Sequence, residues 1–247
     1  MKVLKVVAEG LTTSFRYPHF MQGVQPTFEM PPPATIYGHI CSVLGEWFDP
    51  MGVQFAIHFS FRAHAEDLEH THVLSPTTGK LPETDLPKTL EGAVNPFRRS
   101  ILFWPRLVLY VNRPDWIEHF RSPRYPVALG RSQDLFSYTN VEIIQLEQAT
   151  NVYFEHTLAP YSFARRTALG VVVLMPRFLD YSRNRHPTFG RYVVLHRRAH
   201  TRDFLHMSGE AKTTYWMDPT APQIDGEGLG LAFHTWVGED ESTLRLA

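Results

Sequence analysis

Cysteine is nearly absent from this 247-residue sequence, which contains only Cys41. A single thiol cannot form an internal disulfide, and this favours a reducing compartment. The sequence also lacks any apolar run of the roughly 20 residues that a membrane-spanning helix needs. Its first segment, Met1–Lys5, has too short an apolar part for a signal peptide and is typical of the start of a strand. We therefore expect a soluble, cytoplasmic protein without a membrane partner.

A basic excess is missing as well, since the formal net charge is -1. Free-standing nucleic-acid-binding domains usually carry visible positive charge, so composition argues against that class. Arginine supplies 19 of the 24 basic residues, and its planar fork suits phosphates, base edges and aromatic faces. Residues 177–202 hold seven arginines and one acid, whereas 218–244 hold six acids and no Lys or Arg. These segments form either solvated faces, or a basic face for RNA beside an acidic face for a protein neighbour.

Motifs for metal, nucleophile and cofactor chemistry are absent: the sequence has no HExxH, CxxC, GxSxG, phosphate loop or dinucleotide fingerprint. The histidines and acids of 64–72 lie in a stretch without helical period, which indicates a polar loop rather than a metal site. We expect neither a metal nor a cofactor. Metal-independent RNA cleavage needs a general base and an acid partner. His19, Tyr17 and His39 are candidates for it, although nothing in their spacing selects them.

The first third of the sequence predicts a strand, a long loop and a helix. Residues 3–8 are apolar enough for a buried strand, and 14–33, rich in aromatics and proline, predict an extended surface loop. A helix begins at Pro33 or Ala34, and its apolar face comprises Ile36, Ile40, Val43, Leu44 and Trp47. A second line of small residues includes Gly38, which costs about 1 kcal/mol against alanine in a helix. We expect a strand or ligand backbone to pack closely there.

Further along, Val53–Arg62 alternates apolar and polar residues and predicts a half-buried strand. A long excursion, a strand broken by Pro105, a short helix and a strand follow at 64–98, 101–111, 114–120 and 141–147. Because proline cannot donate to a sheet ladder, the 101–111 strand should be an edge or bulged strand. The order is βαββαβ, the ferredoxin-like motif found in RNA-recognition folds.

The remainder predicts more strands, at 170–175, 191–196 and about 231–237. The expected class is therefore α+β, with a ferredoxin-like domain over 1–150 and a β-rich region over 151–247.

Three segments favour ligand binding. Ser14–Phe20 mixes phosphate donors with rings on which bases stack, although an aromatic loop that fills the core is the alternative. The helix start near Thr35 offers backbone N–H groups and a positive dipole end to a phosphate, although most helix starts bind only water. The segment Ala128–Asp134 places several donors directly before a strand, more than a plain turn needs, and Asp134 is expected to orient Arg131.

Taken in order, SFRYPHFMQGVQPTF, PPPATIYGHICSVLGEWFDP and LGRSQDLFSYTNVE resemble the fifth CRISPR-associated (Cas) protein family, in most detail its type I-B branch. The resemblance covers about the first 150 residues. It implies a modified RNA-recognition fold with a β-hairpin "thumb" within 64–110. It also implies a subunit that caps the 5′ handle of the guide RNA in a type I Cascade complex. The implied partners are guide RNA, the Cascade backbone and large subunits, and target DNA near the PAM.

The resemblance also implies which residues meet the RNA handle. They come from the aromatic loop, the helix start, the return strand of the thumb and the opposite side of the clamp: Ser14, Phe15, Arg16, Tyr17, Thr35, Tyr37, Gly38, His39, Arg98, Arg99, Gly130, Arg131, Ser132 and Gln133.

The type I-C branch of the family is an endoribonuclease with a tyrosine near the end of the first helix and a lysine–histidine pair after the thumb. Here the helix end reads Gly45-Glu46-Trp47-Phe48, and 95–101 contain no lysine–histidine pair. We therefore expect a binding subunit that is not an enzyme. A metal-independent endoribonuclease that processes repeat RNA, and a protein–protein adaptor, remain the alternatives.

Overall fold

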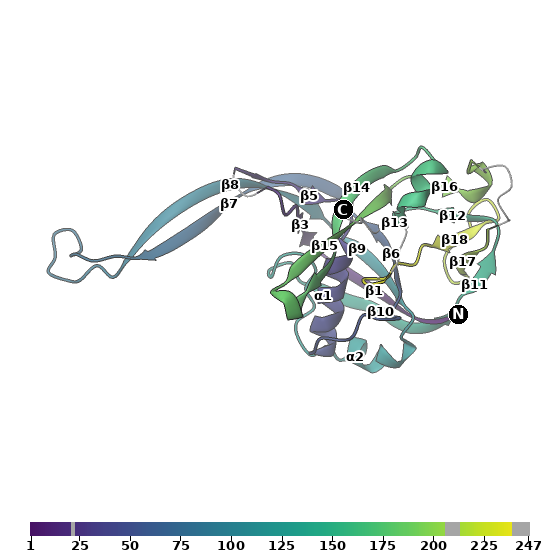
Figure 1. The fold of residues 1–247 in the computed structure, drawn as a ribbon, viewed down its shortest axis with the longest axis horizontal. Helices are drawn as coiled ribbons and strands as arrows, with labels where there is room; N and C mark the ends of the chain where they lie inside the picture. Colours follow the sequence, from purple (N-terminus) through teal and green to yellow (C-terminus); the bar gives the residue numbers. More distant parts are fainter. Residues whose placement is uncertain (21–22, 206–212, 239–247) are drawn as a thin grey trace.

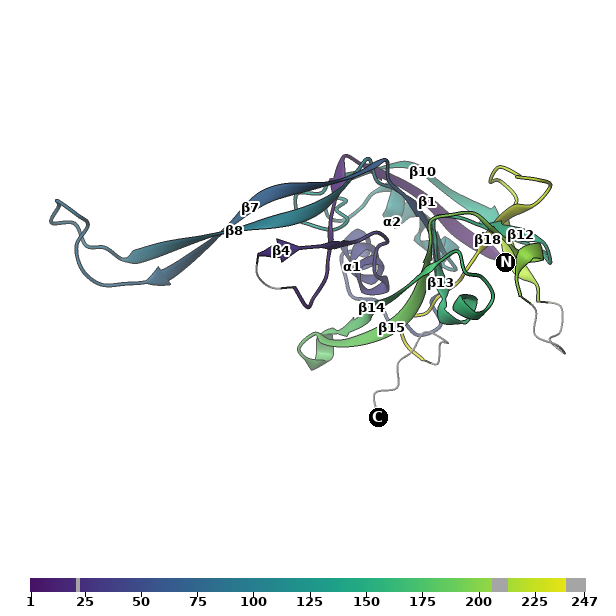
Figure 2. The same ribbon diagram turned by 90° about the horizontal axis from the view of Figure 1, so that it is seen from above.

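The computed structural model describes residues 1–20, 23–205 and 213–238. Figures 1 and 2 show a body from which one long β-hairpin projects, with β12 and β18 at the opposite end of the body. Strands dominate and helices are few, which agrees with the predicted α+β class. In this part of the chain, no helix is both long and apolar enough to cross a bilayer.

A seven-stranded sheet organises the body. Its strand order is β10 (Phe136–Gln145), β1 (Lys2–Gly10), β9 (Arg106–Val111), β6 (Phe55–Ser60), β13 (Thr157–Pro160), β15 (His186–Leu195) and β14 (Val171–Asp180). Neighbouring strands along this path pair antiparallel. Strands from both sides of residue 150 therefore share one sheet.

The helices cover one face of this sheet. Helix α1 (Pro33–Leu44) buries Ile36, Ile40 and Val43 against apolar side chains of β1, β6 and β9. The turn η1 (Pro114–Trp116) and helix α2 (Ile117–Arg121) confirm the predicted short helix. Helix α1 ends earlier than its apolar pattern predicted, because Gly45 adopts a left-handed φ of 82° and its N–H bonds to Cys41 O. Trp47 lies beyond the helix and is exposed.

The opposite face of the large sheet is covered by a five-stranded sheet in the order β11 (Glu147–Ala149), β17 (Tyr215–Asp218), β18 (Gly228–Leu231), β12 (Val152–Phe154) and β16 (Ala199–His200). Leu229 and Leu231 pack on Val3 and Val7 there. Asp218, fully buried, accepts hydrogen bonds from Tyr110 Oη and Lys5 Nζ at 2.8 and 2.7 Å. The turns η2 (Tyr161–Arg165), η3 (Tyr181–Arg183) and η4 (Thr201–Asp203) connect the C-terminal strands.

The long excursion is a β-hairpin. β7 (Ala63–Pro76) and β8 (Leu90–Phe103) pair from Ala63↔Phe103 to Pro76↔Leu90. Near the body, β8 also pairs with β2 (Thr12–Thr13) and β4 (Val24–Gln25). Most hairpin side chains are exposed on both faces, so no apolar period marks the strands. The histidines of 64–72 accordingly lie on a strand and not in the predicted loop.

Several local predictions were wrong. The segment 14–33 lies only partly on the surface: it forms β3 (Phe15–Arg16), β4 and β5 (Thr27–Phe28), and Phe15 and Phe28 enter the core, whereas Arg16, His19 and Phe20 are exposed. The 101–111 strand is two strands broken at Trp104–Pro105, and its second half, β9, lies inside the sheet between β1 and β6. The last predicted strand ends at Leu231. Parts of the predicted 151–247 region, 206–212 and 239–247, lie outside the described residues.

Candidate nucleic-acid interface

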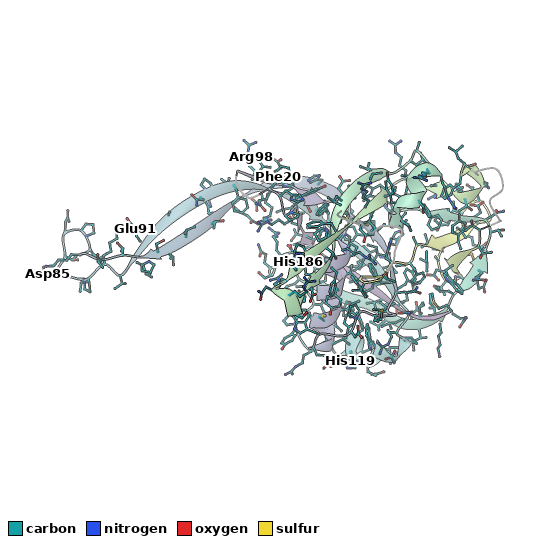
Figure 3. The ribbon with its side chains drawn as sticks, in the orientation of Figure 1. Phe20, Asp85, Glu91, Arg98, His119 and His186 are labelled. Atoms are coloured by element: carbon teal, nitrogen blue, oxygen red, sulfur yellow. The ribbon has the colours of Figure 1, made fainter. Side chains whose placement is uncertain are left out.

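The predicted Ala128–Asp134 segment meets β2, which directly precedes the predicted Ser14–Phe20 segment, where the hairpin leaves the body. Thr13 Oγ1 donates to Leu129 O at 2.6 Å, and Thr12 Oγ1 donates to Asp134 Oδ1 at 2.9 Å. Gly130 permits this approach: its φ is 106°, and a Cβ would lie 2.5 Å from Thr13 Oγ1. The atoms that require a glycine at position 130 therefore belong to the protein itself and not to a ligand. In Figure 3, Phe20 and Arg98 mark the same region, at the base of the hairpin.

Arg131 is held by two carboxylates. Its Nε and Nη2 donate to Asp134 at 2.9 and 2.8 Å, and its backbone N–H donates to Asp134 Oδ2 at 2.9 Å. The predicted orientation of Arg131 by Asp134 is therefore confirmed. The hydrogen bond to Asp134 is the largest contribution that raises the pKa of Arg131 above its usual value. The second carboxylate is Glu69 of β7, which pairs with Nη1.

Glu69 also binds Arg99, whose Nε lies 2.6 Å from Glu69 Oε2. One carboxylate from β7 thus joins the return strand of the hairpin to the loop that carries Arg131. Sequence reasoning missed Glu69 because it assigned the segment to a loop. Glu69 lies opposite Phe97 in the pairing of β7 with β8. A correct prediction of that pairing would have placed Glu69 near Arg99, which is two residues from Phe97. Two arginines facing two carboxylates leave little net charge at this point, but they fix the guanidinium groups in space.

A cavity of about 600 Å³ opens beside this ion-pair cluster. The 16–25 segment and the first part of the hairpin line it, through Arg16, Gly23, Gln25, Thr71, Asn95, Pro96, Phe97 and Arg99. The Arg99 guanidinium lies 5.1 Å from the centre of the Phe97 ring. The cavity therefore combines guanidinium groups, side-chain amides, a hydroxyl and a ring, which are the groups that contact phosphates, base edges, sugars and base faces.

The rest of the aromatic segment fits better the alternative in which an aromatic loop fills the core. Ser14 and Phe15 are each 3% exposed, and the Phe15 ring packs edge-on against Phe59. Neither side chain is presented to a ligand in this structure, so their predicted contact with RNA is not supported. Tyr17 is half-buried and stacks on Phe28 with ring centres 3.7 Å apart, and burial raises the pKa of its hydroxyl.

The helix start also differs from the prediction. Pro31, Pro32 and Pro33 supply no N–H groups, and the Thr35 N–H already donates to Pro32 O at 2.8 Å. Donors for a phosphate are therefore scarce at this N-terminus. Gly38 does not serve close packing either, because no atom of the described chain lies within 4 Å of where its Cβ would be.

Tyr37 and His39 are structural side chains in this fold. Tyr37 is 3% exposed and its hydroxyl donates to Phe48 O at 2.7 Å. His39 Nδ1 donates to Ala128 O at 2.9 Å, and its Nε2 lies 2.8 Å from the Tyr138 hydroxyl, which donates to it. Burial lowers the pKa of His39, which keeps the ring neutral. Both are corrections to the predicted RNA contacts, because each polar group is already paired inside the protein.

Arg98, Ser132 and Gln133 are exposed, as contact with a ligand requires. Arg98 precedes Arg99 on β8 and lies opposite Val24 of β4. The structure therefore brings Arg16, Arg98 and Arg99 to the cavity or to the strand beside it, with the Arg131 loop attached through Glu69.

The arginines of 177–202 do not form one basic face. Arg177 is buried and its Nε donates to Thr235 O at 3.0 Å, and Arg198 pairs with Glu155 at 2.9 Å. Arg202 lies 3.6 Å from Glu227 and 3.8 Å from Asp225. The basic and acidic segments therefore partly neutralise each other, although 239–244 of the acidic segment lie outside the described residues.

No family model matches this sequence, and no curated protein does. Solved structures do match. The fold is shared with a chain described as "CRISPR RNA-guided surveillance complex", at a TM-score of 0.50 and 14% identity over 80% of this chain and 90% of that one.

Two further structures give lower scores. A CRISPR protein from Archaeoglobus fulgidus matches at a TM-score of 0.40 and 10% identity, over 87% of this chain and 91% of that one. A chain of the type III-B Cmr-beta complex bound to cognate target RNA and AMPPnP matches at 0.37 and 11% identity, over 82% and 86%. At these identities the likeness concerns the fold alone.

A metal site is not found among the residues that the structure describes. No group of three or more His, Cys, Asp or Glu side chains there is arranged to hold a metal ion. Of the three cleavage candidates, His19 is exposed and stacks on Phe189 with ring centres 5.9 Å apart, whereas His39 is buried and paired. The chemistry that the arrangement suits best is the binding of an extended, negatively charged ligand at the hairpin base.

Proposed function

We propose that this chain is a non-catalytic RNA-binding subunit of a CRISPR effector complex, and that it caps the 5′ handle of the guide RNA in a type I-B-like Cascade. The observation that carries the proposal is the cavity at the hairpin base. Arg16 and Arg99, which the sequence resemblance assigned to RNA from two distant segments, line the same cavity.

The cavity suits a bent single strand of RNA. The guanidinium groups of Arg16 and Arg99 bind phosphates, and the release of counterions makes such binding depend on salt. Asn95 and Thr71 offer hydrogen bonds to sugars or base edges, and Phe97 offers a ring face. Glu69 supports the site by holding Arg99 in place, so that less side-chain freedom is lost on binding.

The fold supports the same proposal. The chain order β1, α1, β6, β9, α2, β10 and the sheet order β10-β1-β9-β6 are those of a ferredoxin-like, modified RNA-recognition fold. The β7–β8 hairpin lies between the second and third strands of this motif and is the proposed thumb. The C-terminal strands cover the face of the large sheet opposite the helices, so RNA cannot stack on that face. We therefore place the RNA at the base of the proposed thumb.

The proposed partners follow from the thumb. Beyond its base, the hairpin exposes Leu74, Leu90 and Val94 by 64%, 54% and 53%. Gly92 lies opposite Leu74, so Leu90 and Val94, two residues to either side of Gly92, share the face of Leu74. Clustered exposed apolar side chains mark protein contacts. We propose that this surface packs over the guide against a Cascade backbone subunit in the cytoplasm. The large subunit and target DNA near the PAM would lie alongside.

The alternative function is metal-independent cleavage of repeat RNA. His39 disfavours it, because both ring nitrogens are occupied and the pKa is lowered by burial. A protein–protein adaptor is the other alternative, and it does not explain a cavity lined by arginine, amide and aromatic groups.

Purified protein mixed with labelled repeat RNA in EDTA tests the proposal. We expect binding without cleavage, and binding weakened about tenfold or more when Arg16→Ala and Arg99→Ala are combined. Arg113→Ala with Arg121→Ala is the matched control, since both arginines are exposed and pair with acids elsewhere on the surface. A cut at a defined position would support the endoribonuclease instead. Absence of binding, or equal losses in both double variants, would contradict the proposal.

A further inference from the structure

Gln25 is a buried amide in the wall of the proposed RNA cavity, and its carbonyl oxygen is unpaired. The residue is 5% exposed and lines the cavity. Its Nε2 donates to Phe20 O at 2.6 Å. Its Oε1 is shielded from solvent and has no hydrogen-bond partner among the residues that the structure describes. A buried acceptor left unpaired costs about 1–3 kcal/mol of stability. A ligand that enters the cavity and donates a hydrogen bond to this oxygen would remove that cost.

The position of the amide is fixed by the backbone. β4 runs parallel to β8, with Gln25 beside Arg99, and the Arg98 N–H donates to Gly23 O at 2.9 Å. The hydrogen bond to Phe20 O requires that the amino end of Gln25 face Phe20, which determines where the carbonyl end points. Glu69 holds the neighbouring Arg99. Gln25 is thus an anchored acceptor next to an anchored guanidinium group.

We infer that Gln25 selects a nucleobase that carries an exocyclic amino group, an inference that rests on the proposed RNA-binding function. The missing partner of Oε1 must be a donor. Arg16 and Arg99 supply donors and suit the phosphates, whereas the edges of adenine, cytosine and guanine present amino groups and that of uracil does not. Glutamine usually reads adenine through two hydrogen bonds, one from each end of the amide. Here the amino end is taken by Phe20, so Gln25 reads only the amino group of the base.

Because Oε1 is closed to water without a ligand, the base must displace part of the cavity wall to reach it. Gly23 is suited to such a shift: its φ is 77°, and no atom lies within 4 Å of where its Cβ would be. The base then completes a hydrogen bond that water does not make in the free protein.

Two RNA probes that differ only in the amino group of the base test the inference. The probes are a fluorescent RNA of eight adenosines and the same RNA made with purine riboside, which lacks the amino group. The proteins are wild type, Gln25→Ala and Gln25→Met, the last of which keeps the side-chain length. We expect wild type to bind the adenosine probe more tightly, and the ratio of the two affinities to fall by about fivefold or more in both variants. Asn95→Ala, which removes another amide of the same cavity, is measured beside them. Arg121→Ala, which changes a side chain that pairs with Glu118 outside the cavity, should keep the wild-type ratio.

The outcomes separate the inference from the proposed function. If wild type binds both probes and the ratio is the same in the Gln25 variants, the inference is wrong and RNA binding stands. The same conclusion follows if only Asn95→Ala changes the ratio. If wild type binds neither probe nor repeat RNA, the proposed function itself fails. Thermal unfolding of each variant shows whether the fold is kept, and Gln25→Met serves if Gln25→Ala unfolds.

Discussion

Acidification should destabilise this protein through a histidine at the centre of the large sheet. Burial, then the neighbouring His156, then Arg106 lower the pKa of His58 from 6.5 to about 4, while Glu155 opposes the shift. The two imidazole rings lie 5.4 Å apart, and His58 pairs with Thr157 where β6 meets β13. His58 Nδ1 and His156 Nδ1 are buried without a hydrogen-bond partner.

The sign follows from proton uptake. The unfolded chain protonates His58 below its ordinary pKa, whereas the folded protein resists protonation until about pH 4. Stability is therefore complete above the unfolded pKa and is lost as the pH falls from about 6.5 to about 4. His58 accounts for a loss of about 1 kcal/mol at about pH 5.5 and of about 3 kcal/mol once both states are protonated.

Urea unfolding measures this loss at several pH values in wild type and His58→Leu. The variant shares every other titrating group, so the difference between the two proteins isolates His58. We expect the free energy of unfolding of wild type to fall more steeply, by about 1 kcal/mol or more between about pH 7.5 and 5.5. Parallel curves for the two proteins would refute the reasoning.

Four further changes give distinct results. Glu69→Gln removes the carboxylate shared by two arginines, so we expect a loss of about 1–2 kcal/mol in urea unfolding and a steeper dependence of RNA affinity on salt; an unchanged salt slope would count against the site. Gly130→Ala drives a Cβ into Thr13 Oγ1 and should cost about 2–4 kcal/mol. Gly23→Ala meets no neighbour and should cost only about 1 kcal/mol, so equal losses would disprove the packing argument. Replacing residues 73–93, which include the exposed Leu74 and Leu90, by Asn-Gly should leave the Tm of the body unchanged while weakening assembly with a backbone subunit, and unchanged assembly would argue against the proposed thumb.

The sequence was most informative where one face of an element is buried. The alternation of Val53–Arg62 predicted β6, and the apolar spacing from Ile36 to Val43 predicted α1, because burial imposes a period on each. The hairpin strands carry no such period, since water surrounds both faces, and their pairing depends on backbone hydrogen bonds that side chains do not reveal.

Site residues were predictable by chemical type but not by burial. Arg16 and Arg99, which were predicted to contact RNA, line one cavity, whereas Phe15 and His39, which were predicted to do the same, are buried in the core. Nothing local distinguishes a ring that stacks on a base from one that packs on Phe59. Gln25 went unnoticed because its significance lies in an unpaired oxygen, which only the folded structure defines.

The central claim is that RNA is held at the base of the hairpin. The most direct measurement is photo-crosslinking of 4-thiouridine-labelled repeat RNA to the intact protein, followed by mass spectrometry of the crosslinked peptides. We expect crosslinks within the 14–25 segment and within 95–99 of β8, reduced when Arg16 and Arg99 are replaced by alanine. Crosslinks confined to the arginines of 177–202, with none at the hairpin base, would contradict the claim.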